Sequence, residues 1–157
     1  MLEAIIICSS IAFGSILHIV AKEEIKTSKK YIIFARTVLI ILTATLLIYA
    51  DFNPIMILSL LFGFTLFLFL KNLYLIIGAA TFLSLSSQNM VLILSSILLL
   101  TLVHSSLSAP SKKMFIRNSL YFILPFSLVL IETFIKGNLD IFTGFIAGGL
   151  LAQLKGP

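Results

Sequence analysis

Long apolar runs occupy most of this chain, and only short polar stretches interrupt them. Sixty per cent of the 157 residues are hydrophobic and 11% are charged. A water-soluble domain of this length cannot bury so much apolar surface. We therefore predict that lipid surrounds the chain, as an all-α, polytopic integral membrane protein that crosses a cell membrane several times. The whole chain, 1–157, is expected to form a single transmembrane helical domain.

The apolar runs predict a bundle of about seven transmembrane helices. A helix that crosses the hydrocarbon core of a bilayer needs about 20 mostly apolar residues. The segments that approach this length are 2–21, 31–50, 54–70, 73–87, 90–107, 114–135 and 139–154. The short pair 54–70 and 73–87 leaves an alternative open, a re-entrant hairpin in place of two full crossings. The short connections predict that helices consecutive in sequence pack against each other in antiparallel pairs.

The basic residues orient this bundle. Lys and Arg are enriched in cytoplasmic connections. With the N-terminus outside and the C-terminus cytoplasmic, ten of the eleven Lys and Arg residues fall on the cytoplasmic side, and only Lys136 lies outside. The net charge of +5 is thereby explained as an orientation signal, so nucleic acid is not an expected partner. The bilayer is the expected surrounding, and anionic lipid is a candidate partner.

Motifs that carry known chemistry are absent. The sequence contains no phosphate-binding glycine loop, no Ser/His/Asp or Cys/His set and no zinc-binding His-Glu-x-x-His helix. Cys8 is the only cysteine, so neither a disulfide nor a Cys-based metal site can form. Two histidines could in principle ligate a haem, but nothing in the sequence pairs them. We predict no metal, no cofactor and no catalytic residue, and we find no resemblance to a known family.

Small residues mark a packing face in the last run. Gly144 and Gly148 are four residues apart, so they lie on the same side of a helix. In lipid, helices associate where small side chains let two backbones approach closely. We interpret these two glycines as a helix-packing contact and not as a binding site.

A transporter or channel is the first functional hypothesis. Asn118, Tyr121, Pro125 and Glu132 follow one another at three- to seven-residue steps on one face of the sixth run. Pro125 leaves a backbone carbonyl without its helical partner, and such carbonyls bind ions or substrates in many transporters. The same proline also serves packing in many membrane helices.

Two further hypotheses remain. Arg36, Arg117, His18 and His104 all fall toward the cytoplasmic side, where they could together bind the phosphate of a phospholipid or an isoprenoid phosphate, as a binding protein or an enzyme. Alternatively, Arg36 anchors its helix, and His18 hydrogen-bonds a neighbour or touches water. The near-absence of loops also fits a non-catalytic subunit or assembly factor of a larger membrane complex, with other membrane subunits as partners. An enzymatic role is the least supported.

Overall fold

A computed structural model describes residues 2–50, 52–70, 72–85, 90–107, 111–131, 135 and 137–155. The described residues form seven α-helices and no β-strand, which confirms the all-α fold class. The helices are α1 (Leu2–Val20), α2 (Lys22–Ala50), α3 (Pro54–Leu70), α4 (Leu73–Ser84), α5 (Met90–Leu107), α6 (Lys112–Ile123) and α8 (Leu139–Ala152). The 3-10 helix η1 (Leu124–Ile131) continues α6, and the short 3-10 helix η2 (Gln153–Lys155) follows α8.

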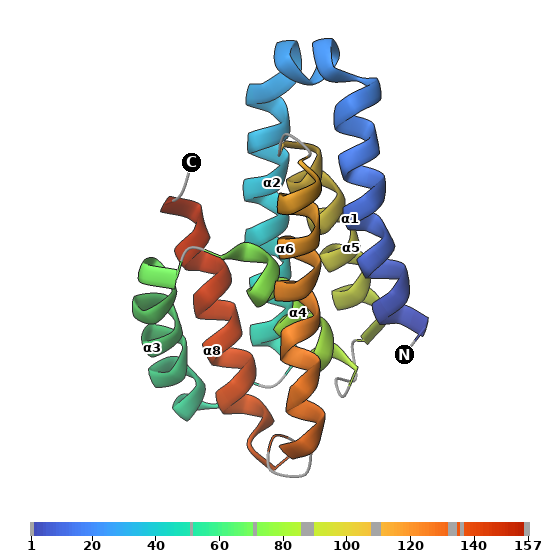
Figure 1. Ribbon diagram of the computed structural model, residues 1–157. Helices are drawn as coiled ribbons and strands as arrows, with labels where there is room; N and C mark the ends of the chain where they lie inside the picture. Colours follow the sequence, from blue (N-terminus) through green and yellow to red (C-terminus); the bar gives the residue numbers. More distant parts are fainter. Residues whose placement is uncertain are drawn as a thin grey trace.

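The polar stretch 22–30 is helical, although the sequence was expected to form a connection there. α2 starts at Lys22, one residue after the end of α1. The stretch contains neither glycine nor proline, and Glu23 and Glu24 lie in the first turn, where negative charge complements the helix macrodipole. Figure 1 shows α1 and α2 joined at the top by helical turns that project beyond the other helices.

Helices that are consecutive in sequence are not, for the most part, packing partners. α5 packs extensively against both α1 and α2, which contact each other over only a few of the described residues. α3 packs chiefly on α8, far along the chain, and these two helices lie side by side in Figure 1. The expectation of antiparallel neighbouring pairs is therefore wrong for α1 and α2 and for α3 and α4. Short connections bring the ends of two helices together, but they do not determine which faces of the helices pack.

Glycine residues determine which helix faces pack against each other. A Cβ atom at Gly148 would overlap the carbonyl oxygen of Leu60 on α3, and one at Gly63 would overlap the carbonyl oxygen of Phe145 on α8. Gly144 faces Met56 and Ser59 of α3 in the same way. The backbones of α3 and α8 therefore touch, which is the contact that small residues permit in lipid-embedded helices.

The sixth apolar run is not one continuous α-helix. α6 ends at Ile123, and the backbone continues as the 3-10 helix η1. The change comes immediately before Pro125, which lacks an N–H and whose ring crowds the preceding turn. Pro125 itself is buried.

α4 is the central helix of the fold. It has only 12 residues, and Leu75 is the single position in it that is not buried. α5, α6, α8 and η1 all pack around it. At about 1.5 Å per residue a helix of this length reaches about 18 Å, well short of a bilayer core of about 30 Å. Among the described residues, α4 is thus an internal helix and not a lipid-facing one.

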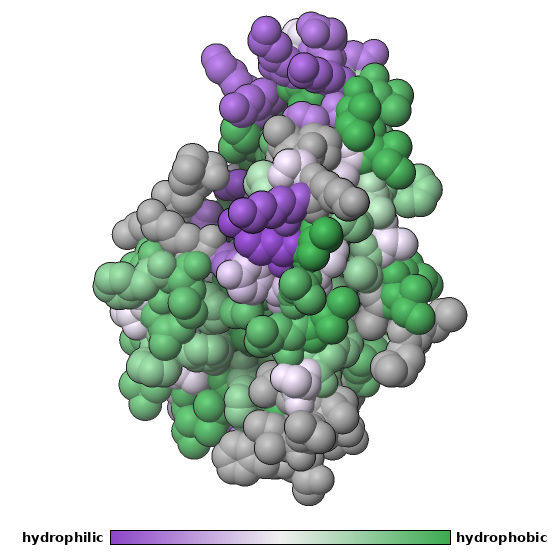
Figure 2. Space-filling view, in the orientation of Figure 1, coloured by the Kyte–Doolittle hydropathy of each residue, from purple (hydrophilic) through white to green (hydrophobic). Residues whose placement is uncertain are grey.

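The outer surface is largely apolar. Figure 2 shows hydrophobic side chains over most of the visible face, with hydrophilic ones gathered at the α1–α2 turn and over the start of α6. Phe69 is 88% exposed and Val20 is 81% exposed. Two helices, α2 over Lys22–Tyr49 and α5 over Met90–Leu107, are long and apolar enough to cross a membrane by length and composition. Seven crossings therefore remain a prediction.

Candidate functional site: a polar pocket at the start of α4

A pocket of about 330 Å³ lies where the start of α4 meets the end of α5 and the first turns of α6. We call it the polar pocket, because polar atoms form most of its surface. Its described lining residues are Leu70, Asn72, Leu73, Tyr74, His104, Met114, Arg117, Asn118 and Tyr121. None of these is acidic. The volume equals that of about ten water molecules at about 30 Å³ each, enough for a hydrated phosphate group.

The N-terminus of α4 forms one wall of the polar pocket. Asn72 caps this helix, and its side-chain oxygen accepts a hydrogen bond from the N–H of Leu75 at 3.3 Å. The first N–H groups of a helix have no carbonyl partner within it, and the helix dipole adds a partial positive charge there. Helix N-termini bind anions for this reason.

His104 comes from the last turn of α5. Its ring packs against Tyr74, with the ring centroids 5.1 Å apart. The Nδ1 atom of His104 is buried and has no hydrogen-bond partner among the described residues. A buried polar atom without a partner is uncommon in a native structure and indicates a ligand, an ion or a water molecule. His104 lines the polar pocket, although its Nδ1 atom is itself buried away from that space.

Two arginines provide positive charge. Arg117, on the second turn of α6, lines the polar pocket and is exposed. Arg36, on α2, is only 7% exposed and is not among the described lining residues. Guanidinium groups bind phosphate and carboxylate through paired hydrogen bonds. The pocket therefore combines a helix N-terminus, an imidazole and the guanidinium of Arg117.

The structure brings together some of the sequence-predicted residues and separates others. His104, Arg117, Asn118 and Tyr121 all line the polar pocket, although the first two were proposed for phosphate binding and the last two for transport. His18 is not among the lining residues. It lies on α1, and its Nδ1 donates a hydrogen bond to the carbonyl oxygen of Ser106 at 2.6 Å.

The remaining predicted residues do not contribute to this pocket. Pro125 is buried at the start of η1 and is not a lining residue. Glu132 lies outside the described residues. Of the predicted transport stripe, Asn118 and Tyr121 therefore line the polar pocket, and Pro125 lies in the 3-10 helix η1.

Asn72 and Tyr74 are lining residues that the sequence reasoning did not single out. Asn72 was assigned to a connection between two apolar runs, and Tyr74 to the interior of a run. Asn followed by an apolar run is a recognisable N-cap signal. That signal would have located the start of α4, but not the neighbours that meet it.

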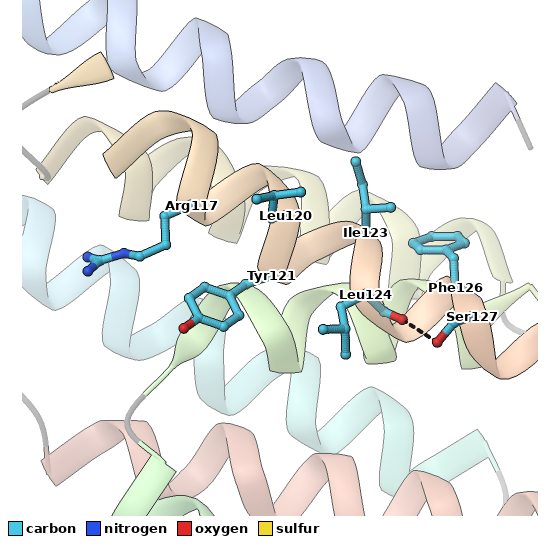
Figure 3. A pocket seen from close by; sticks show the side chains of 7 residues that line it. All are labelled: Arg117, Leu120, Tyr121, Ile123, Leu124, Phe126 and Ser127. Atoms are coloured by element: carbon cyan, nitrogen blue, oxygen red, sulfur yellow. Dashed lines mark hydrogen bonds between the residues drawn. The ribbon is translucent and has the colours of Figure 1, made fainter. Parts of the chain in front are cut away.

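An apolar groove of about 630 Å³ adjoins the polar pocket. It follows α6 into η1 and is lined by Arg117, Leu120, Tyr121, Ile123, Leu124, Phe126 and Ser127. Arg117 and Tyr121 line both spaces. Figure 3 shows these two side chains together at one end of the groove, with Phe126 and Ser127 at the other. The hydroxyl of Ser127 donates a hydrogen bond to the carbonyl oxygen of Leu124 at 2.8 Å, so it presents little free polarity to the groove.

Neither space resembles a metal site or a nucleophilic centre. No group of three or more His, Cys, Asp or Glu side chains that could hold a metal ion occurs within the described part of the chain. The sole cysteine, Cys8, lies on α1 and is not a lining residue of either space. What the polar pocket offers chemically is the binding of an anion through nitrogen donors and tyrosine hydroxyls.

Comparison with protein-family models, with characterised proteins and with solved structures finds no significant match to this chain.

Proposed function

We propose that this protein is a multi-pass membrane protein that binds a phosphate-bearing ligand in the polar pocket, on the cytoplasmic side of the bilayer. The observation that carries the proposal is the polar pocket itself, where the N-terminus of α4 and the guanidinium of Arg117 meet beside His104. The helix N-terminus and the guanidinium favour an anion, and no acidic side chain is among the described lining residues.

Membrane placement is supported by the outward-facing apolar side chains. Contiguous apolar patches of more than a few hundred Å² are rare on soluble monomers, whereas Phe13, Leu58, Phe62 and Phe69 are among many large apolar side chains that are more than half exposed. The distribution of Lys and Arg supports an outside N-terminus. The polar pocket then faces the cytoplasm, because it adjoins the start of α6, whose first two turns contain Lys112, Lys113 and Arg117.

Topology is tested by labelling cysteines from outside intact cells. In a Cys8→Ala background, Lys26→Cys is expected to be protected from a membrane-impermeant maleimide until the cells are permeabilised, and Gly137→Cys is expected to react at once. The reverse pattern would invert the topology. Recovery of the folded chain in the soluble fraction would exclude the membrane placement.

Phosphate binding is tested with the purified protein in detergent. Binding of methyl phosphate and of inorganic phosphate is followed by line broadening in ³¹P NMR. A hydrogen bond to a charged group contributes about 1.5–3 kcal/mol, so we expect Arg117→Ala to weaken binding about ten- to a hundred-fold. His104→Phe keeps an aromatic ring against Tyr74 and should also weaken binding.

Lys113→Ala is the matched control. It removes one positive charge from the same helix, at an exposed position that does not line the polar pocket. Equal losses in the Lys113→Ala and Arg117→Ala variants would mean that general surface charge attracts the anion, and the proposed site would be wrong. No detectable binding to the unmodified protein would have the same consequence.

A further inference from the structure

The apolar groove carries an inference about what bears the phosphate. It adjoins the polar pocket and shares Arg117 and Tyr121 with it. A soluble phosphate compound would use the polar pocket alone and would leave the groove without a role. An amphiphile with a charged head and an apolar chain matches both spaces at once.

The dimensions of the groove fit a hydrocarbon chain. Its lining extends from Arg117 on α6 to Ser127 at the middle of η1. At about 1.5–2.0 Å per residue these ten steps cover roughly 15–20 Å. One leaflet contributes about half of the roughly 30 Å hydrocarbon core. The groove therefore covers about the depth that a lipid chain occupies below its headgroup.

The groove is also apolar where a chain would lie and charged where a headgroup would lie. Leu120, Ile123 and Leu124 are each more than half exposed along it. Arg117, the only charged residue among its described lining, stands at one end of the groove in Figure 3 and also lines the polar pocket. A lipid with an anionic headgroup is complementary to this arrangement, whereas a zwitterionic lipid would bring its own cation toward Arg117.

We infer that the ligand is a phosphate-bearing membrane lipid, whose headgroup lies in the polar pocket between His104 and Arg117 and whose hydrocarbon chain lies in the groove along α6 and η1. The inference rests on the proposed phosphate-binding function and adds the chemical class of the ligand. It assigns specificity to Arg117, because this residue contacts both spaces.

The chain contains no tryptophan, so one introduced tryptophan becomes a unique fluorescent reporter. We place it in the groove with Ile123→Trp and, one turn nearer Arg117, with Leu120→Trp. The control is Leu58→Trp, a position on α3 that is 70% exposed and outside both spaces. Each variant is reconstituted in phosphatidylcholine nanodiscs that contain a small fraction of either phosphatidic acid or phosphatidylcholine with brominated chains, which quench tryptophan on contact.

Brominated phosphatidic acid should quench the groove tryptophan several-fold more than brominated phosphatidylcholine at the same mole fraction. The control tryptophan should not distinguish the two lipids, and adding Arg117→Ala should abolish the preference in the groove. Unchanged binding of methyl phosphate by the reporter variants shows that the polar pocket is intact. The two lipids are compared only in a tryptophan variant whose binding of methyl phosphate is unchanged.

The two proposals fail in different ways. If methyl phosphate binds and depends on Arg117, but neither reporter prefers the anionic lipid, the site takes a free phosphate compound and the lipid inference is overturned. If the control tryptophan shows the same preference as the groove, the lipid is attracted by general charge and the inference is again overturned. If methyl phosphate does not bind at all, the proposed function itself is wrong.

Discussion

Gly148→Ala should destabilise the protein although alanine is the better helix former. A Cβ atom at this position would overlap the carbonyl oxygen of Leu60 and would lie 2.8 Å from the backbone nitrogen of Phe64. Backbone atoms of α3 cannot rotate away as a side chain would, so α3 and α8 must separate. A gap of 0.5–1 Å forfeits roughly a quarter to a half of each contact along the interface.

The net change in the free energy of unfolding is the difference between two opposing contributions. Overpacking costs about 1–3 kcal/mol, and a backbone-to-backbone overlap belongs near the upper end. Replacing glycine by alanine within a helix returns about 1 kcal/mol. We therefore expect a net loss of about 2 kcal/mol in the free energy of unfolding. For a chain of this size that corresponds to a fall of about 4–8 °C in Tm.

The assay uses the single cysteine as its reporter. Cys8 is partly buried, so its reaction with a thiol-reactive fluorophore during heating in detergent reports unfolding. The control is Gly137→Ala, because a Cβ atom there would meet nothing within 4 Å, and its Tm should not fall. If Gly148→Ala and Gly63→Ala both behaved like this control, α3 and α8 would not be in backbone contact and the reasoning would be refuted.

Three smaller losses should be measurable in the same assay. His18→Ala removes a hydrogen bond between α1 and α5 and should lower the free energy of unfolding by about 1 kcal/mol. Binding of methyl phosphate should stay unchanged in this variant. Reduced binding would mean that His18 belongs to the site after all. Thr43→Val keeps the side-chain shape but removes the hydroxyl that donates to Ser96 across the α2–α5 contact at 3.2 Å, and should cost about 0.5–1.5 kcal/mol. Asn53→Ala removes the 2.9 Å hydrogen bond to the carboxylate of Asp140 and should cost about 1 kcal/mol. Once Asp140→Ala is present, Asn53→Ala should cost less, because only its 3.4 Å hydrogen bond from the N–H of Ile55 then remains to be lost.

The all-α class of this fold could be predicted because the hydropathy of each segment alone indicates whether that segment forms a helix. Each apolar run must satisfy its own backbone hydrogen bonds once it leaves water, and a helix does so without help from the rest of the chain. The ends of the helices were less predictable. The charged stretch 22–30 forms a helix because no residue in it prevents one, and polarity alone does not end a helix.

Packing partners could not be read from the same information. Gly63 and Gly148 are 85 positions apart, and each could face any other helix until the fold is known. The sequence shows which residues permit close approach but not which helix approaches. The candidate site depends on this missing information, because its described lining comes from the end of α3, from Asn72 and from α4, α5 and α6. For that reason Arg117 and Tyr121, next-turn neighbours on one helix, were first assigned to two different hypotheses.

The position of the polar pocket follows from the burial of a short helix. A buried helix must place its unpaired N–H groups somewhere, and in an apolar surrounding each unsatisfied group costs several kcal/mol. Gly78 lets α4 approach the carbonyl oxygen of Phe122 on α6, and this close approach brings the preceding turns of α6, with Arg117 and Asn118, beside the start of α4. The same contact that buries α4 therefore collects polar side chains at its N-terminus. Since Asn72 caps only one of the N–H groups in the first turn, an anion in the polar pocket would stabilise α4 as well as bind to it, so ligand binding and the stability of the central helix should rise and fall together.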